Sequence, residues 1–225
     1  MKEKKMKTAK WMLLSAFVIL GMLPVLWLQQ GCKGNYPPVA SMLQPPFTPT
    51  PTPGPIFMSF DGISSLPSGW VSSIASGTFA DPALLLSTGQ NQESSCTTSC
   101  HSLLAGPIVF SAANQAANIE YSFPAGTAGT YLVGKTISLY YYMDALPSSA
   151  SYGQIYVQSG AANGYNYKSV GFASMTAGVW TQASIPANQG GVDSTDIWKF
   201  GAQIGTGSGS GFNSVNFYVD NVAIQ

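Results

Sequence analysis

Short runs in which apolar and polar residues alternate, or in which β-branched and aromatic residues dominate, fill the second half of the chain. Clusters of Gly, Pro, Asn and Ser separate these runs, as is typical of turns between strands. The runs are 136–144, 153–159, 167–174, 179–185, 197–204 and 215–224. After residue 55 the sequence shows no amphipathic stretch of normal helix length. The pattern predicts an all-β domain, an antiparallel β-sandwich or jelly roll.

The alternation within each run also predicts which side chains point away from the core, because successive strand residues face opposite sides of a sheet. Ile155 and Val157 mark the apolar side of one run, and Phe200 marks that of another. We interpret Trp180 and Trp198 as core residues too. The side chains expected on outward faces are Tyr140, Tyr142, Gln154, Tyr156, Gln158, Lys199, Gly201 and Gln203.

The first 55 residues follow a different pattern. Five lysines precede an uncharged apolar run at 11–28, and Gly31-Cys32 comes soon after it. Eight prolines then lie between residues 33 and 55, in a stretch that favours extended polyproline II and acts as a semi-rigid spacer. We therefore predict a signal peptide at 1–31, a tether at 32–55 and the β-sandwich domain at 56–225.

This order of segments resembles a bacterial lipoprotein signal peptide. The resemblance implies that Cys32 becomes the first residue of the mature chain and carries the lipid. The protein would then be exported and anchored to a membrane of the cell envelope. Ordinary secretion with an unpaired cysteine and an uncleaved membrane anchor remain alternatives, and both also place the domain outside the cytoplasm.

Charged residues are sparse: the chain has nine Lys and Arg together and nine Asp and Glu. Five of the lysines lie in the predicted signal peptide, so the remaining domain is mildly acidic. This balance argues against nucleic acid as a partner, because binding to the phosphate backbone depends on clustered Lys and Arg. His101 is the only histidine, and no motif pairs two carboxylates or a nucleophile with a base. We therefore expect no enzyme.

Four groups of residues stand out along the domain: Phe60-Asp61-Gly62 with Trp70, Val179-Trp180-Thr181 leading to Ile185-Pro186, residues 196–204, and residues 217–222. Together they resemble carbohydrate-binding modules of the galactose-binding-domain-like β-sandwich type. The resemblance implies a glycan on one concave sheet and a structural calcium where the first and last strands meet. Asp61 and Asp220 are the candidate ligands, since calcium is bound by carboxylate and carbonyl oxygens. Alternatively, Asp61 starts a turn and Asp220 accepts hydrogen bonds at a bulge.

Sugars are bound by aromatic rings, which stack on their C–H faces, and by amides that pair with their hydroxyls. The outward residues Tyr140, Tyr142, Gln154, Tyr156, Gln158 and Gln203 are therefore predicted to form a platform for a neutral polysaccharide. Tyr165 and Tyr167 could instead form a loop rim, and exposed Tyr and Gln could merely decorate a half-solvated sheet. The alternative function is a structural or adhesive protein of the cell envelope that binds no sugar.

The two remaining cysteines lie in Cys96-Thr97-Thr98-Ser99-Cys100-His101. In an oxidising compartment a local disulfide between Cys96 and Cys100 is the simplest outcome. The spacing differs from the C-x-x-C-H that attaches haem, and three soft ligands are too few for a structural zinc.

Overall fold

The computed structural model describes residues 56–93, 96–124 and 130–225. The predicted signal peptide, Cys32 and the proline-rich tether lie outside these residues. Within the described part of the chain, no helix has the length and apolar character needed to cross a membrane.

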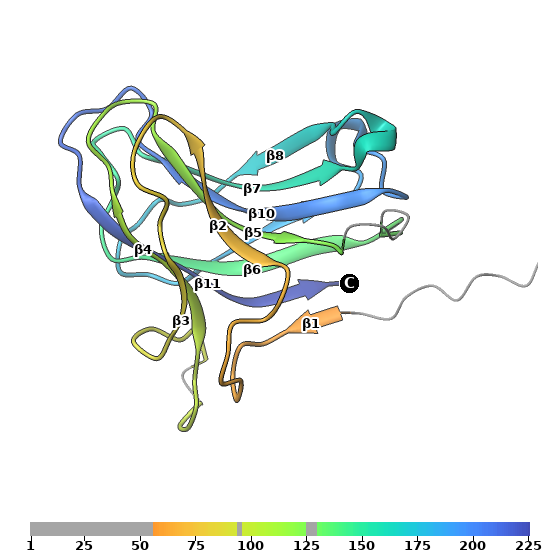
Figure 1. Ribbon diagram of the computed structural model, residues 1–225, viewed down its shortest axis with the longest axis horizontal. Helices are drawn as coiled ribbons and strands as arrows, with labels where there is room; N and C mark the ends of the chain where they lie inside the picture. Colours follow the sequence, from red (N-terminus) through yellow and green to blue (C-terminus); the bar gives the residue numbers. More distant parts are fainter. Residues whose placement is uncertain (1–55, 94–95, 125–129) are drawn as a thin grey trace, which may run out of the picture. The chain divides into compact units, whose positions relative to one another are not determined.

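The described chain forms two antiparallel sheets that pack face to face (Figure 1). The six-stranded sheet has the order β3-β4-β11-β6-β9, with β1 also paired to β11. Its strands are β1 (Ile56–Met58), β3 (Leu84–Ser87), β4 (Ser102–Val109), β6 (Thr136–Met143), β9 (Thr181–Pro186) and β11 (Ser214–Ile224). The predicted β-sandwich is thereby confirmed.

The five-stranded sheet has the order β2-β5-β10-β7-β8. Its strands are β2 (Trp70–Ser76), β5 (Ala116–Ser122), β7 (Tyr152–Ser159), β8 (Tyr167–Gly171) and β10 (Ile197–Gly205). Two single 3-10 turns, η1 (Ala161–Asn163) and η2 (Gln189–Gly191), are the helical elements of the described residues.

The core lies between the sheets and is built by the predicted alternation. Ile155 and Val157 of β7 and Phe200 of β10 are fully buried in it. At one end Trp70 contacts Phe60 and Phe200, with ring centroids 5.6 and 5.9 Å apart. Burying each such large apolar side chain contributes about 1.5–3 kcal/mol relative to its exposed state. The core therefore fixes which faces of the two sheets are left outward.

The core assignment of Trp180 and Trp198 is wrong. Trp198 lies at a register shift between β10 and β7, where the alternation of sides is interrupted, and its ring packs on Tyr165 with centroids 5.2 Å apart. Trp180 precedes β9 and packs against Tyr142 on the outer face of the six-stranded sheet. Neither tryptophan belongs to the cluster between the sheets.

Candidate functional site

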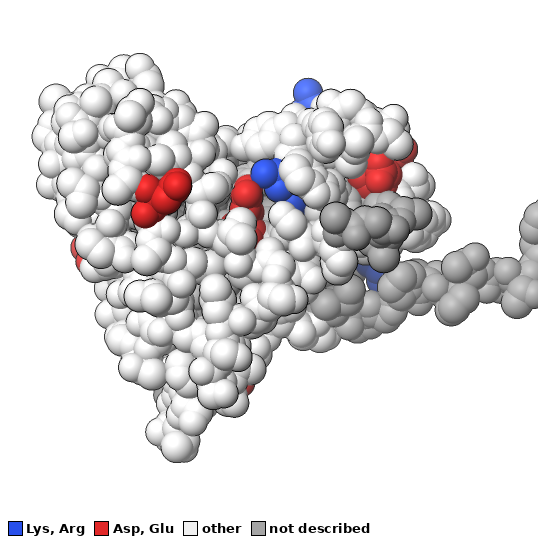
Figure 2. Space-filling view, viewed as in Figure 1, with Lys and Arg blue, Asp and Glu red and all other residues white. Residues whose placement is uncertain are grey.

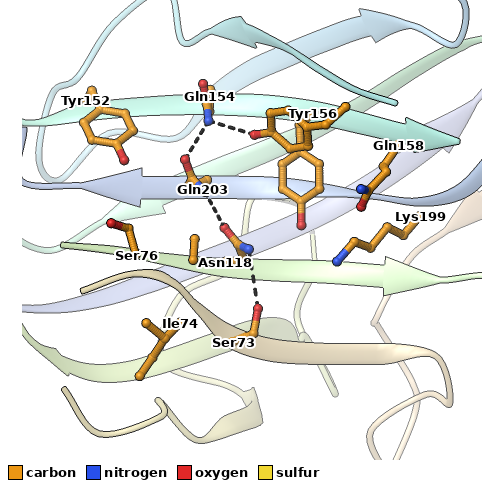
Figure 3. A pocket seen from close by; sticks show the side chains of 12 residues that line it. Ser73, Ile74, Ser76, Asn118, Tyr152, Gln154, Tyr156, Gln158, Lys199 and Gln203 are labelled. Carbon is orange, nitrogen blue, oxygen red and sulfur yellow. Dashed lines mark hydrogen bonds between the residues drawn. The ribbon is translucent and has the colours of Figure 1, made fainter. Parts of the chain in front are cut away.

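The outer face of the five-stranded sheet carries an open cleft of about 460 Å³ (Figure 3). Side chains from all five strands line it, and most of them are amides, hydroxyls or tyrosines. Four residues of the predicted platform lie together here, namely Gln154, Tyr156, Gln158 and Gln203. Sequence alternation alone placed these four residues on one face, because they share the outward side of β7 and β10.

A chain of hydrogen bonds, called here the amide row, crosses the floor of the cleft from β8 to β2 (Figure 3). Gln154 Nε2 donates to the Tyr167 hydroxyl at 2.8 Å and to Gln203 Oε1 at 2.6 Å. Gln203 Nε2 donates to Asn118 Oδ1 at 2.9 Å, and Asn118 Nδ2 donates to Ser73 Oγ at 3.4 Å. Each amide orients the next, so the remaining donors and acceptors point in fixed directions.

Beside the amide row lies an ion pair between a buried carboxylate and a half-buried lysine. Lys199 Nζ donates to Glu120 Oε2 at 3.0 Å, and the Tyr156 hydroxyl donates to the same oxygen. Burial raises the pKa of Tyr156 well above its ordinary value, and the negative charge of Glu120 raises it further. Tyr156 therefore stays protonated and remains a donor to Glu120. The pair is electrically neutral as a unit, which leaves the cleft without net charge from these groups.

Gly201 makes this contact possible. It lies on β10 between Tyr156 of β7 and Glu120 of β5, and it pairs with both in register. A Cβ atom at Gly201 would come within 2.5 Å of the carbonyl oxygen of Ile119 and 2.9 Å of the Glu120 Cα. Because Gly201 has no side chain, the side chains of Tyr156 and Glu120 can meet above β10.

Tyr156 is on the predicted face but is only 1% exposed, so its predicted role as a stacking surface is corrected. Tyr167 packs beside it, with ring centroids 5.1 Å apart, and is itself 38% exposed. Burial raises the pKa of Tyr167 to about 12. Tyr165, 49% exposed, packs on Trp198 at the rim. The rings that line the cleft and are open to a ligand are therefore those of Tyr167 and the half-buried Tyr152, with Tyr165 nearby in sequence.

Tyr140 and Tyr142 do not lie in the cleft. Both are on β6 and point outward from the other sheet, so the predicted six-residue platform is divided between two faces. Alternation within a strand tells which side chains share a face of that strand, but it does not tell which sheet the strand joins. The sequence analysis did not single out the cleft residues Ser73, Asn118 and Tyr152. It placed Lys199 on the outward face but did not identify Glu120 as its partner.

The two predicted calcium ligands lie at the end where β1 and β11 pair. Asp61 Oδ1 accepts hydrogen bonds from His101 N at 2.8 Å and Asn91 Nδ2 at 2.9 Å. Asp220 is buried and accepts from Gln92 N at 3.0 Å. Burial raises the pKa of Asp220 to about 6, and the charge of Asp61 adds to the effect while the hydrogen bonds oppose it.

These two carboxylates supply the oxygen ligands that calcium prefers. A bound cation would also relieve the repulsion between their negative charges, so the two residues fit calcium. Their hydrogen bonds to backbone N–H groups equally match the alternative turn and bulge roles. Calcium binding therefore stays a prediction.

The loop between β3 and β4 contains the predicted disulfide. Cys96 and Cys100 are bonded, with Cα atoms 5.7 Å apart. Their sulfurs lie within 4.8 Å of an Asp61 oxygen, but bonded sulfurs do not act as thiolate ligands. Nδ1 of His101 is buried and has no hydrogen-bond partner among the described residues.

No protein-family model matches the sequence, and a search for curated relatives finds no match. Among solved structures, the chain is similar to a carbohydrate-binding module studied for the promiscuous specificity of the β-sandwich superfamily, at 15% identity and a TM-score of 0.49. That match covers 74% of this chain and 61% of the other.

Two further similar structures come from Clostridium thermocellum. One is a family 11 carbohydrate-binding module in complex with a β-1,3-1,4-mixed-linked tetrasaccharide, at 15% identity and a TM-score of 0.46, covering 76% of this chain and 95% of the module. The other contains the CBM22-1 and GH10 modules of endo-1,4-β-D-xylanase 10B with xylohexaose, at 14% identity and a TM-score of 0.46, covering 76% of this chain and 28% of that one. Similarities at this level do not identify a ligand for this chain. The fold and the cleft define a two-sheet β-sandwich with a polar, tyrosine-edged groove on its five-stranded sheet.

Proposed function

We propose that the cleft on the five-stranded sheet binds a neutral polysaccharide and does not cleave it. The observation that carries the proposal is the amide row beside the exposed Tyr167 ring. Adjacent strands lie about 4.8 Å apart, so the row presents a polar group at each strand across the sheet. An extended chain of sugar rings offers hydroxyls at a comparable repeat, and the ring of Tyr167 offers a stacking face.

The electrostatics of the cleft favour a neutral ligand. Lys199 is already paired with Glu120 and its side chain is 19% exposed, so it offers little free positive charge to an anionic sugar. Figure 2 shows that charged side chains are few on the face that it displays. Binding should therefore depend little on salt concentration.

The arrangement of acids supports binding without hydrolysis. Glycoside hydrolysis needs two carboxyl groups on opposite sides of the scissile bond. Glu120 lies under the cleft and is engaged by Lys199 and Tyr156, and the described residues that line the cleft include no second carboxylate.

The chain would act from a surface. We infer that Cys32 is lipidated and that residues 33–55 hold the domain away from the membrane, on the basis of the sequence alone. Cys32→Ser should then leave the precursor unprocessed, and mass spectrometry would detect the intact N-terminal segment. Normal maturation of this variant would contradict the lipoprotein assignment. A structural or adhesive role remains the competing function, and it would require no sugar affinity of the cleft.

The proposal is tested by titrating the full-length chain with xylohexaose and with a β-1,3-1,4-mixed-linked glucan tetrasaccharide. Tyr167→Ala and Gln154→Ala should each weaken binding about tenfold, equivalent to about 1.4 kcal/mol, because each removes one ligand contact. Gln225→Ala is the matched control, since Gln225 is exposed and bonded through its backbone to Thr136 of the other sheet. Equal affinity of all three variants and the wild type would refute the cleft as the binding site.

A further inference from the structure

A continuous row of large side chains crosses the outer face of the six-stranded sheet. Leu85 of β3 lies opposite Leu104 of β4, Leu104 lies opposite Tyr218 of β11, and Tyr218 lies opposite Tyr142 of β6. The last pair between β6 and β9 is Tyr141 with Thr181, and Trp180 immediately precedes Thr181. Trp180 therefore continues the row beside Tyr142, with which its ring packs. The cleft on the other sheet uses none of these residues.

Three rings of this row pack on one another and are called here the aromatic row. Tyr142 has its ring centroid 5.4 Å from that of Trp180 and 5.5 Å from that of Tyr218. Tyr218 is only 8% exposed, whereas Tyr142 and Trp180 are half-buried. Trp180 Nε1 is buried and has no hydrogen-bond partner among the described residues, so the indole is held by packing. Tyr218 is thus the floor, and the other two rings form the accessible surface.

An oriented carboxylate lies next to the aromatic row. Asp144 follows β6 two residues after Tyr142 and is exposed. Its Oδ1 accepts from Asn216 N at 2.8 Å, and its Oδ2 accepts from Asn216 Nδ2 at 2.7 Å. Asp144 and its partner Asn216 each lie two residues from a ring of the aromatic row, Asp144 from Tyr142 and Asn216 from Tyr218. In keeping with this placement, the charge of Asp144 adds to burial in raising the pKa of Tyr218. Each carboxylate oxygen keeps a lone pair for another donor.

We propose that this face is a second carbohydrate-binding surface, taking a neutral, hydroxyl-rich chain with Trp180 and Tyr142 against its C–H face and Asp144 against its hydroxyls. The inference rests on the proposed function in one respect: it assigns the same class of ligand to a second surface. Its own evidence is the combination of packed rings with a fixed hydroxyl acceptor on the sheet opposite the cleft.

The charges on this face favour a neutral, hydroxyl-rich ligand. The lysines of the described residues lie elsewhere: Lys168 and Lys199 belong to the five-stranded sheet, and Lys135 is in the turn before β6. An anionic ligand would therefore meet Asp144 without a compensating cation. A purely apolar partner would bury that negative charge with the Asn216 hydrogen bonds but without a cation, which is unfavourable. A sugar satisfies both groups, because it has an apolar face and hydroxyl donors at its edge.

Calorimetric titration of the full-length chain with xylohexaose and with the mixed-linked tetrasaccharide tests the inference by counting sites. The wild type should bind two molecules of a recognised oligosaccharide per chain. Trp180→Ala should bind one, at the cleft, and Tyr167→Ala should show a cleft affinity about tenfold weaker while the second site is unchanged. Trp180→Phe keeps a ring and should retain both sites, which guards against a folding defect of the alanine variant. Phe57→Ala is the matched control, because Phe57 is an exposed aromatic residue of the same sheet that lies at its far end, opposite Ala223.

The outcomes separate the two proposals. One site that responds to Tyr167→Ala and not to Trp180→Ala would overturn the second surface and leave the cleft proposal standing. One site that responds only to Trp180→Ala would overturn the cleft proposal and leave the second surface standing. A monomer–dimer equilibrium in sedimentation that Trp180→Ala abolishes, without any effect on sugar binding, would assign the face to self-association and overturn the inference.

Discussion

The outer faces of the two sheets both carry tyrosines, but they use them in opposite ways. On the five-stranded sheet, Tyr156 is buried beside Tyr167 and its hydroxyl donates to Glu120. On the six-stranded sheet, Tyr142 packs ring against ring with Trp180 and Tyr218, and polar contacts are at the border. One face is therefore organised by hydrogen bonds and the other by aromatic area.

This difference determines how each face should respond to change. A hydrogen-bonded network in a poorly solvated place is strong when complete and costly when one member is removed. A packed aromatic surface at the solvent boundary loses only the contact area of the residue that is changed. The same chemical change should therefore reduce the stability of the protein strongly on the hydrogen-bonded face and only slightly on the aromatic face.

The largest effect is expected for Lys199→Met. This change leaves Glu120 buried without its cation, and breaking a buried pair in this way costs about 3 kcal/mol of unfolding free energy. Urea denaturation measures the loss. The double variant Glu120→Gln with Lys199→Met should recover much of it, because no unpaired charge then remains. A loss below about 0.5 kcal/mol for Lys199→Met would show that the pair behaves as an ordinary surface ion pair.

The second-largest effect is expected on the pH dependence of stability, through Asp220 of β11. The folded-state pKa of Asp220 is raised to about 6, above its ordinary value, so the folded protein binds more protons than the unfolded chain between about pH 4 and pH 6. Stability should therefore fall as pH rises through this window, by on the order of 2 kcal/mol. Thermal melts from pH 4 to 7 in chelator measure the fall, and Asp220→Asn should abolish it.

The same thermal melts in excess calcium test whether Asp61 and Asp220 bind the ion. A cation at Asp61 and Asp220 favours the charged carboxylate, so it should raise the melting temperature above pH 6 by mass action and flatten the dependence on pH. Identical melts in chelator and in calcium would leave Asp61 and Asp220 with their observed roles as acceptors for backbone N–H groups.

The sequence predicted the fold class because alternation and turn residues are local signals. It placed Gln154, Gln158 and Gln203 on one outward face for the same reason. Sheet membership is not local: β6 pairs with β11 and β9, which are far away in sequence, so Tyr140 and Tyr142 were grouped with the wrong face.

Two further features could not be predicted from the local sequence pattern. The register shift near Trp198 breaks the alternation at a position where the sequence shows no Gly or Pro. The contact between Tyr156 and Glu120 depends on the gap at Gly201, and an isolated glycine in a strand gives no indication of which side chains will cross it. Buried networks of this kind follow from three-dimensional register rather than from composition.

An intermediate effect is expected for Tyr156→Phe, which removes one hydroxyl from the network and keeps the ring. Glu120 then loses one of its donors in a buried place, and hydrogen bonds to charged groups contribute about 1.5–3 kcal/mol. We expect a loss of about 1.5 kcal/mol in urea denaturation, because Lys199 still neutralises the charge. A neutral result would mean that Lys199, with the longer contact from Ser73 Oγ at 3.5 Å, is enough to satisfy Glu120.

The smallest effect is expected for Tyr140→Phe, the same removal of a hydroxyl on the outer face of the other sheet. Tyr140 lies half-buried on the outer side of β6, opposite Gln182, away from the buried cluster between the sheets. The unfolding free energy should therefore change by less than about 0.5 kcal/mol, as for an ordinary surface substitution. The difference between Tyr156→Phe and Tyr140→Phe is the critical quantity, since the two changes are chemically identical. Equal losses in the two variants would show that both outer faces depend on hydrogen bonding to the same degree, and the contrast between a hydrogen-bonded face and an aromatic face would then be wrong.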